Sequence, residues 1–263
     1  MKKYKTVLLL SISFSLIAMI IIPLIISVVI SFQDSSSYIK QEFGFTSVNY
    51  IKLINNMDYL KYVLNTAILS FASAIILTII LIPASYSISQ FKYYNTLIIV
   101  LFVIAFIPEQ SIIYNEYRIL TFFNLNNSLS SVVLLYVAKF LPETIIILSI
   151  FIKSIPSEIF EAAKLEKVSY PKFLYHIVFR LSIPMVTFVF FTVFICAWNE
   201  YLISAFMLYN DSVKTINTAL VFLTNNRYAS NIPLQTAAVN ISMLPMILLY
   251  LIIHKKMIKN IHI

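Results

Sequence analysis

The sequence predicts an all-α polytopic membrane protein with six transmembrane helices. Hydrophobic residues make up 60% of its 263 residues, whereas a soluble domain is roughly 45–50% apolar. Several apolar stretches reach the length of about 18 residues that a helix needs to cross a bilayer. Short segments of alternating polarity, which are typical of membrane-spanning strands, do not occur. We therefore expect every span to be helical.

Six stretches are expected to cross the membrane: residues 7–31, 62–89, 96–120, 129–153, 184–208 and 234–254. The first follows a lysine-rich start and imitates a signal peptide. It runs to Ile30, beyond the roughly 7–15 apolar residues of such a peptide, and no small-x-small cleavage site follows, so we interpret it as a retained span. A short helix is predicted near residues 48–55. The third span is interrupted at Pro108-Glu109-Gln110.

A long polar segment, residues 155–185, separates the fourth and fifth spans. Its first helix is predicted to start at Pro156-Ser157-Glu158, with proline and an acidic residue in positions that favour a helix N-terminus. Its apolar positions fall on one side at helical spacing: Ile159, Phe160, Ala163 and Leu165. A second short helix is predicted from Ser169, a good N-cap, with Pro171 in its first turn. Two amphipathic helices between spans predict a docking surface for another protein.

The distribution of lysine and arginine predicts the orientation. Twelve of these residues fall on the side of the N-terminus and of the polar segment, and six on the other side, with Lys139 set aside inside a span. Because cytoplasmic loops are enriched in lysine and arginine, we expect both termini and the polar segment in the cytoplasm. The same distribution accounts for the net charge of +8, so nucleic acid is not an expected partner.

Polar residues inside the predicted spans are candidate functional groups, because a charge near the bilayer centre costs about 2.5–3.5 kcal/mol. Lys139 and Glu143 lie at i, i+4 in the fourth span, where they can meet on one helix face. Glu109 follows the proline of the third span, and Asn199-Glu200 lies inside the fifth. These five residues are the candidate translocation path. A structural pair of Lys139 and Glu143 is the alternative.

No catalytic or metal-binding pattern is found in the sequence. The three histidines lack metal-ligand spacing, and Cys196 is the single cysteine. With Gly44 as the only glycine, a glycine-rich phosphate-binding loop cannot be built. Any ATP that the protein uses must therefore be hydrolysed by a partner.

The polar segment resembles a known family. Glu161-Ala162-Ala163, followed by Ser169, Phe173 and Ile183-Pro184, is similar to the EAA loop of binding-protein-dependent ABC importers. In that family the loop docks onto the cytoplasmic ATPase subunit. The resemblance implies that Glu161 makes a charge contact with the ATPase, and that Ala162 and Ala163 let the helix pack closely in a groove of that subunit.

The chain departs from the family pattern in two places. The coupling set implied by the resemblance includes Lys167, which stands where the family usually has the glycine that turns the chain between the two helices. A left-handed backbone at a residue other than glycine costs roughly 1–2 kcal/mol. The glycine-bearing C-terminal tail of the family is also absent from the end of the sequence, residues 260–263, which predicts weaker tail contacts with the ATPase.

Further pieces resemble the carbohydrate-uptake branch of these permeases, specifically the second permease of the maltose-type pair. They occur in the same order along the chain: Leu64-Asn65-Thr66-Ala67, Ile107-Pro108-Glu109, Ser154-Ile155-Pro156, Trp198-Asn199-Glu200-Tyr201, Thr215-Ile216, and Ala237-Ala238 with Pro245. The resemblance extends over nearly the whole chain from Phe45 on. It implies a single permease domain over residues 1–263, with core spans over about 62–254 and the EAA-type loop over about 154–183.

The implied function is that of a permease subunit of an ATP-driven importer in a bacterial-type cytoplasmic membrane. The chain is then no enzyme and binds no cofactor, since ATP and Mg²⁺ belong to the partner. Its implied partners are cytoplasmic ATPase subunits, a second permease subunit, an extracytoplasmic substrate-binding protein and the lipid bilayer. The alternative is a stand-alone ion-coupled secondary transporter that uses Lys139 and Glu143. An intramembrane enzyme is disfavoured, because no nucleophile–base pair shares a membrane depth.

Overall fold

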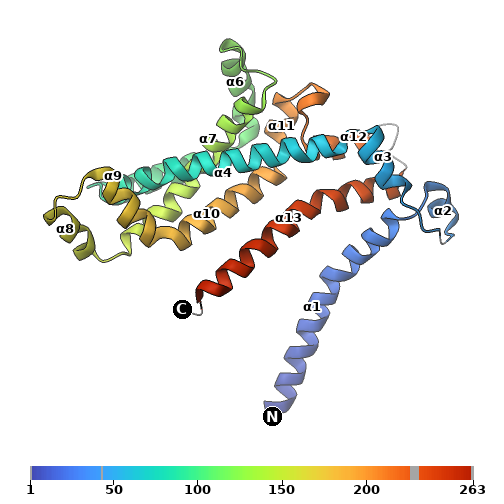
Figure 1. Cartoon of the computed structure of the whole chain (residues 1–263), viewed down its shortest axis with the longest axis horizontal. Coiled ribbons are helices and arrows are strands. Elements are labelled where there is room, and N and C mark those ends of the chain that lie inside the picture. The colour runs from blue at the N-terminus through green and yellow to red at the C-terminus, as the bar shows by residue number, and fades with distance from the viewer. Residues whose placement is uncertain (1, 43, 226–230, 262–263) are drawn as a thin grey trace. The chain divides into compact units, whose positions relative to one another are not determined.

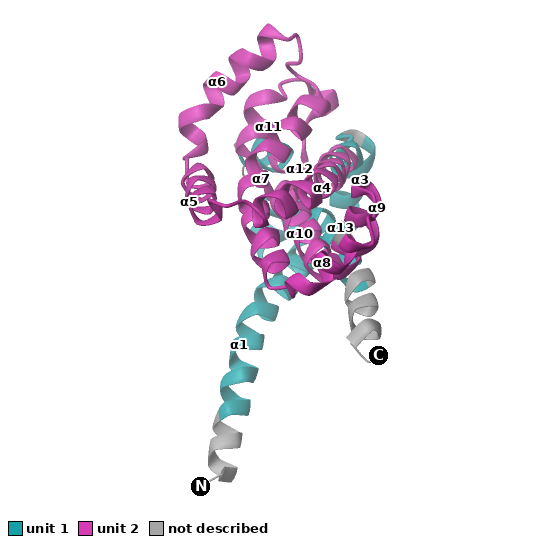
Figure 2. Ribbon diagram, turned by 90° about the vertical axis from the view of Figure 1, so that its left-hand side faces the viewer, with its two compact units in different colours: residues 1–63, 218–263 teal, residues 64–217 magenta. Residues whose placement is uncertain are grey.

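The computed structural model describes residues 2–42, 44–225 and 231–261, and its regular secondary structure over these residues is helical (Figure 1). His262 and Ile263 of the C-terminal sequence lie outside the described residues. The helices group into two compact units (Figure 2). Unit 1 comprises residues 1–63 and 218–263, and unit 2 comprises residues 64–217. The single permease domain inferred from the sequence stays a prediction.

Among the described residues, five helical stretches are long and apolar enough to cross a membrane. They are Leu9–Ser31 within α1 (Lys2–Ser31), α4 (Tyr59–Ser89), α7 (Leu129–Lys153), the stretch Tyr170–Asn199, and Ile232–Leu251 within α13 (Ile232–Ile261). A sixth span is possible if α5 (Tyr94–Ala105) and α6 (Glu109–Phe122), which are bent by 86° at a short break, form one span. The all-helical, multi-pass prediction is confirmed.

The break between α5 and α6 lies where the sequence predicts it. Pro108 has an extended backbone, with φ −63° and ψ 124°, and precedes the first residue of α6. A proline disfavours the helical conformation of the residue before it, so a helix usually ends at that point. Glu109 is then an acidic residue in the first turn of α6, where the helix dipole favours negative charge.

Unit 1 pairs the first helix with the last. α1 packs along α13, and Ser27 and Asn240 join them by two hydrogen bonds: the Ser27 hydroxyl donates to the Asn240 side-chain oxygen (3.2 Å), and the Asn240 amide donates to the Ser27 carbonyl (3.3 Å). The Tyr59 hydroxyl donates to the Ala238 carbonyl at 3.1 Å and lies 2.9 Å from the Ser242 hydroxyl. These contacts tie α13 to both α1 and the start of α4.

The segment between α1 and α4, residues 32–58, contains two short helices, α2 (Ser35–Lys40) and α3 (Val48–Asn56). The second confirms the helix predicted near residues 48–55. The Asn49 amide donates to the carbonyls of Ser31 (3.0 Å) and Gln33 (2.7 Å), which end α1 and open the segment. α3 also packs on α13, so this segment is held against the helices of its own unit.

Unit 2 is built around α7, which packs against α5 and α10 (Arg180–Asn199). α7 starts at the Ser128 N-cap, whose hydroxyl accepts a hydrogen bond from the Ser131 amide, and Lys153 lies in its last turn. Its buried face includes Tyr136, Leu148 and Ile152. This face places Lys139, one turn after Tyr136, at the edge of the unit's core.

The fifth predicted span differs from the structure at both ends. Its helix starts at Tyr170, so that α9 (Tyr170–Phe173), the π-helical turn η1 (Leu174–Phe179) and α10 form one continuous stretch. The second short helix of the polar segment therefore continues directly into the span. At the other end the helix stops at Asn199, not at residue 208, and Leu202–Met207 forms a separate short helix, α11. The residue that ends the span, Glu200, has an extended backbone.

Candidate functional site

The first candidate site is the coupling loop, which we define as residues 154–183. It contains α8 (Ser157–Leu165), which follows Pro156. Of the described side chains of α8, only Phe160 and Ala163 are buried. Ile159 and Leu165, which the sequence places on the same apolar side, are exposed. The buried face of α8 is therefore narrower than predicted, because the helix is covered along one short line only.

The turn after α8 keeps a left-handed residue although the chain has no glycine there. Lys167 has a φ of 51°. The Val168 amide donates to the Ala163 carbonyl (3.3 Å) and the Glu166 amide to the Ala162 carbonyl (3.0 Å). A bond from the third residue after a helix back to the third-last residue of that helix is the mark of a Schellman C-cap, in which a left-handed residue reverses the chain. The local geometry thus compensates for the unfavourable conformation of Lys167.

The second helix of the loop starts where the sequence predicts. Ser169 has the extended backbone of an N-cap (φ −62°, ψ 144°), and proline occupies the first turn of α9. The Ser169 hydroxyl makes no capping hydrogen bond, but its carbonyl accepts one from the Phe173 amide at 2.9 Å. The backbone conformation alone therefore starts the helix.

The six residues of the predicted coupling set divide between two faces. Glu161, Ala162, Lys167 and Ser169 are exposed, whereas Ala163 and Phe173 are buried against their own unit. Of the two alanines expected to pack in a groove of the ATPase, only Ala162 lies on the exposed face of α8.

Replacement of Lys167 with glycine is expected to raise the free energy of opening of α8 by up to about 1 kcal/mol, because glycine adopts positive φ without a steric penalty. The amides of α8 should then exchange more slowly. The same replacement at Lys172, which lies within helical α9, is the matched control and is expected to destabilise its helix by about 1 kcal/mol. Hydrogen exchange of the loop amides measures both effects. Faster exchange of α8 in K167G would contradict a left-handed Lys167.

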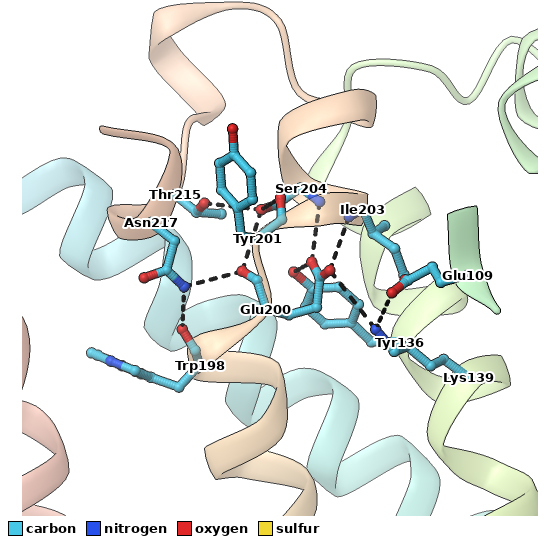
Figure 3. A network of polar contacts seen from close by, with 10 residues as sticks. All are labelled: Glu109, Tyr136, Lys139, Trp198, Glu200, Tyr201, Ile203, Ser204, Thr215 and Asn217. Atoms are coloured by element: carbon cyan, nitrogen blue, oxygen red, sulfur yellow. Dashed lines mark hydrogen bonds and ion pairs between the residues drawn. The ribbon is translucent and has the colours of Figure 1, made fainter. Parts of the chain in front are cut away.

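The second candidate site is a polar cluster in unit 2, which we define as Glu109, Lys139 and Glu200 with their hydrogen-bond partners (Figure 3). The Lys139 ammonium group lies 2.6 Å from a carboxylate oxygen of Glu109 and 3.8 Å from one of Glu200. The Glu200 side chain is only 5% exposed, whereas those of Lys139 and Glu109 are 33% and 20% exposed. The cluster therefore joins a buried carboxylate to an ion pair that lies closer to the surface of the unit.

Glu200 accepts hydrogen bonds from two helices. The Tyr136 hydroxyl of α7 donates to it at 2.9 Å, and the backbone amides of Ile203 and Ser204 in α11 donate at 2.9 and 3.2 Å. These amides open a helix and have no intrahelical acceptor of their own. The carboxylate thus satisfies the backbone groups that the break after Asn199 leaves free.

Residues further along the sequence, Thr215 and Asn217, make hydrogen bonds on the other side of Glu200. The Asn217 amide donates to the carbonyls of Trp198 (2.9 Å) and Glu200 (3.1 Å), and the Thr215 hydroxyl donates to that of Ser204 at 3.2 Å (Figure 3). Sequence reasoning identified none of these roles. Tyr136 could have been found, since it lies one helical turn before Lys139.

Two of the family-like pieces meet beside this cluster. The Asn65 amide donates to the carbonyls of Ser212 (3.1 Å) and Lys214 (2.9 Å), and the Thr66 hydroxyl accepts the Ile216 amide at 2.9 Å. The start of the second predicted span therefore holds the segment that carries Thr215-Ile216, which lies about 150 residues away in the sequence.

Two residues of the predicted path lie apart from the cluster. Lys139 forms its ion pairs with Glu109 and Glu200, so the predicted meeting of Lys139 with Glu143 does not occur. Glu143 is exposed, and no cation within the described part of the chain pairs with it. Asn199 is also exposed, and its amide donates to the Ile195 carbonyl of its own helix. The ion-pair partners of Lys139 therefore come from other segments of the chain and not from α7.

Two carboxylate oxygens near the cluster accept no hydrogen bond from the described residues. Glu109 Oε1 and Glu116 Oε2 are buried and have no hydrogen-bond partner among the described residues. Both residues lie on α6, seven positions apart, which corresponds to two turns of one helix face. Both acceptors are enclosed by the protein in this structure.

Glu200→Ala is expected to lower the free energy of unfolding by about 3 kcal/mol, because it leaves buried donors of α7 and α11 without their acceptor. Asn199→Ala is the matched control next to it. Its exposed side chain bonds only to its own helix, so the expected change is within about 0.5 kcal/mol. Thermal unfolding of the purified protein in detergent measures both, and equal losses would contradict the role assigned to Glu200.

Known proteins resemble this chain over most of its length. The melibiose/raffinose/stachyose import permease protein MelC of Bacillus subtilis is 30% identical over 196 residues, which cover 73% of this chain and 70% of MelC. The trehalose/maltose transport system permease protein MalG of Thermococcus litoralis is 25% identical over 249 residues, covering 90% and 88%. No protein-family model matches the chain.

The fold also has a solved counterpart. A chain from the crystal structure of a bacterial ABC transporter involved in the import of the acidic polysaccharide alginate superposes with a TM-score of 0.73. The match covers 93% of this chain and 94% of the other at 14% sequence identity, so it supports the fold alone. Because the chain is 30% identical to an import permease over 70% of the length of that protein, it belongs to the family of ABC importer permease subunits.

Proposed function

We propose that this protein imports a carbohydrate as one permease subunit of an ATP-driven transporter. The observation that supports this most directly is the similarity to permeases whose names specify melibiose, raffinose and stachyose, or trehalose and maltose. The chain covers at least 70% of the length of both relatives. The proposed substrate class is therefore an oligosaccharide, which the binding protein of the system would select.

ATP hydrolysis is assigned to a partner subunit. The chain contains one glycine, so it cannot form the glycine-rich loop that cradles nucleotide phosphates. The coupling loop offers an exposed, charged face that includes Glu161 and Ala162. We infer that this face docks onto a cytoplasmic ATPase, which holds ATP and Mg²⁺, and that Glu161 makes a charge contact there.

The remaining assembly follows from the same proposal. A second permease would complete the path across the bacterial-type cytoplasmic membrane, and an extracytoplasmic binding protein would deliver the sugar. Both termini of this chain would lie in the cytoplasm, as the distribution of lysine and arginine predicts. Binding of the loaded binding protein and closure of the ATPases would then switch the pair of permeases between outward- and inward-facing states.

The translocation path is proposed to run beside α6. Glu109 Oε1 and Glu116 Oε2 offer buried acceptors without partners, and sugar hydroxyls are suitable donors. Lys139 is a partly exposed donor beside them. Glu200, in contrast, is nearly enclosed and saturated with donors, so its proposed role is to hold the path's shape. Glu143 and Asn199 remain candidates only for contacts with sugar or with the second permease.

An ion-coupled secondary transporter is the competing proposal. It depends on Lys139 and Glu143 as a titrating pair, but Lys139 is engaged with Glu109 and Glu200. No observation favours this alternative over an ATP-driven importer, and the two differ in their energy source.

Affinity purification of the chain from its native membrane tests the proposed function. We expect an ATPase and a second permease to co-purify, and uptake by vesicles containing the complex to require ATP inside and to persist when proton and sodium gradients are collapsed. Uptake by this chain alone, driven by either gradient, would overturn the proposal.

Glu161→Lys is expected to reduce uptake by at least tenfold, on the order of the 1.4 kcal/mol or more that a reversed charge contact costs. Membrane insertion should be unchanged, because Glu161 is exposed. Glu166→Lys, an equal charge reversal at an exposed residue just beyond α8, is the control and should retain uptake. Wild-type uptake by E161K would reject the coupling role of Glu161.

A further inference from the structure

Three aromatic rings, two from the coupling loop and one from α4, form a closed triangle. Tyr86 belongs to α4, Phe160 to α8 and Phe173 to α9. The ring centroids lie 5.7 Å apart for Tyr86 and Phe160, 5.0 Å for Tyr86 and Phe173, and 6.0 Å for Phe160 and Phe173. All three pairs meet edge-to-face, with interplanar angles of 72°, 63° and 69°, which is a favoured geometry for aromatic contacts.

Of the two described side chains that α8 buries, the larger belongs to the triangle. Phe160 is 4% exposed, and Ala163 is the other described buried side chain of this helix. Phe173 and Tyr86 are buried as well. Because the other described side chains of α8 are exposed, its side-chain contacts with the unit are made by Phe160, the larger of the two, and by Ala163.

The space next to the triangle is not filled. A pocket of about 130 Å³ is lined by Tyr86, Ala163, Val168, Tyr170 and Phe173. Tightly packed interiors transmit displacement through every contact, but here the packing on one side of the rings is incomplete. The ring-to-ring contacts are therefore the continuous part of the link between α8 and α4.

Tyr86 is the member of the triangle that belongs to a predicted span. It lies in α4, three residues before the end of the helix. Its hydroxyl makes no hydrogen bond within the described part of the chain. What Tyr86 contributes to the coupling loop is thus its ring and not its polar group.

We propose that Tyr86 is a positioning residue that transmits movement of the coupling helix α8 to the transmembrane helix α4 through the rings of Phe160 and Phe173. The proposal rests on the proposed function, since it requires an ATPase that moves α8. It assigns a role in energy coupling to a residue of the second predicted span, outside the coupling loop itself. Loss of the ring should separate ATP hydrolysis from transport and leave the subunits assembled.

The test uses the complete transporter, with its ATPase, second permease and binding protein, reconstituted into vesicles. Three variants are compared with the wild type: Tyr86→Leu removes the ring, Tyr86→Phe retains it, and Tyr93→Leu makes the same change at an exposed tyrosine in the turn after α4. Three quantities are measured: the amount of ATPase that co-purifies, the rate of ATP hydrolysis, and the substrate taken up per ATP hydrolysed.

Y86L is expected to assemble and hydrolyse ATP, but to take up on the order of tenfold less substrate per ATP. Y86F and Y93L are expected to keep the wild-type ratio. A wild-type ratio in Y86L overturns the proposal. An equal loss in Y86F or in Y93L also overturns it, because the ring would then not be the cause.

A second variant covers the case in which Y86L does not accumulate in the membrane. Phe160→Leu removes another ring of the triangle from a short helix outside the spans, and it should lower the same ratio. If it keeps the wild-type ratio, the triangle does not couple the two helices.

Where both single variants accumulate, the double variant should lower the uptake per ATP no further than either single variant does, since both break the same link. If the wild-type chain binds no ATPase, the proposed function fails, a result distinct from failure of the Tyr86 proposal.

Discussion

The hydrogen bonds that the Glu200 carboxylate accepts are the interactions on which the rest of unit 2 depends. Where no water is available, backbone amides must find partners within the protein, and a break in an apolar helix exposes several of them. Glu200 ends α10 and accepts hydrogen bonds from the first amides of α11. The Tyr136 hydroxyl then ties the same carboxylate to α7. The break is stable because the residue that causes it also satisfies the groups that it frees.

The positions of Lys139 and Glu109 depend on this arrangement. An ammonium group near a buried carboxylate reduces the cost of enclosing that charge, and a second carboxylate, Glu109, completes the pairing. Since Glu109 opens α6, this ion pair joins the start of α6 to α7, while α5 packs directly against α7.

The coupling loop is attached to the rest of unit 2 by few side chains. Under the proposed function it presents a polar face to the ATPase and is also joined to the spans. Its turn is held by a Schellman C-cap around Lys167, and its apolar anchor is the ring of Phe160 against Tyr86 and Phe173. A narrow anchor leaves most of α8 exposed for docking. It also concentrates the attachment of α8 in a few side chains, which is the basis of the role proposed for Tyr86.

The sequence alone determined the all-helical class, the position of most spans, the break at Pro108, the starts of α8 and α9, and the family. The structural features among these depend on hydrophobic runs, prolines and caps, whose effects act within a few neighbouring residues. The family was inferred instead from the resemblance of the EAA-type loop and of further pieces of the chain to known permeases. Only the tertiary structure decided that Lys139 pairs with Glu109 and Glu200 and not with Glu143, that Ala163 faces inward, and that Tyr86 meets the coupling loop. Helical spacing states which residues share a face, but the identity of the group opposite that face depends on how distant segments pack.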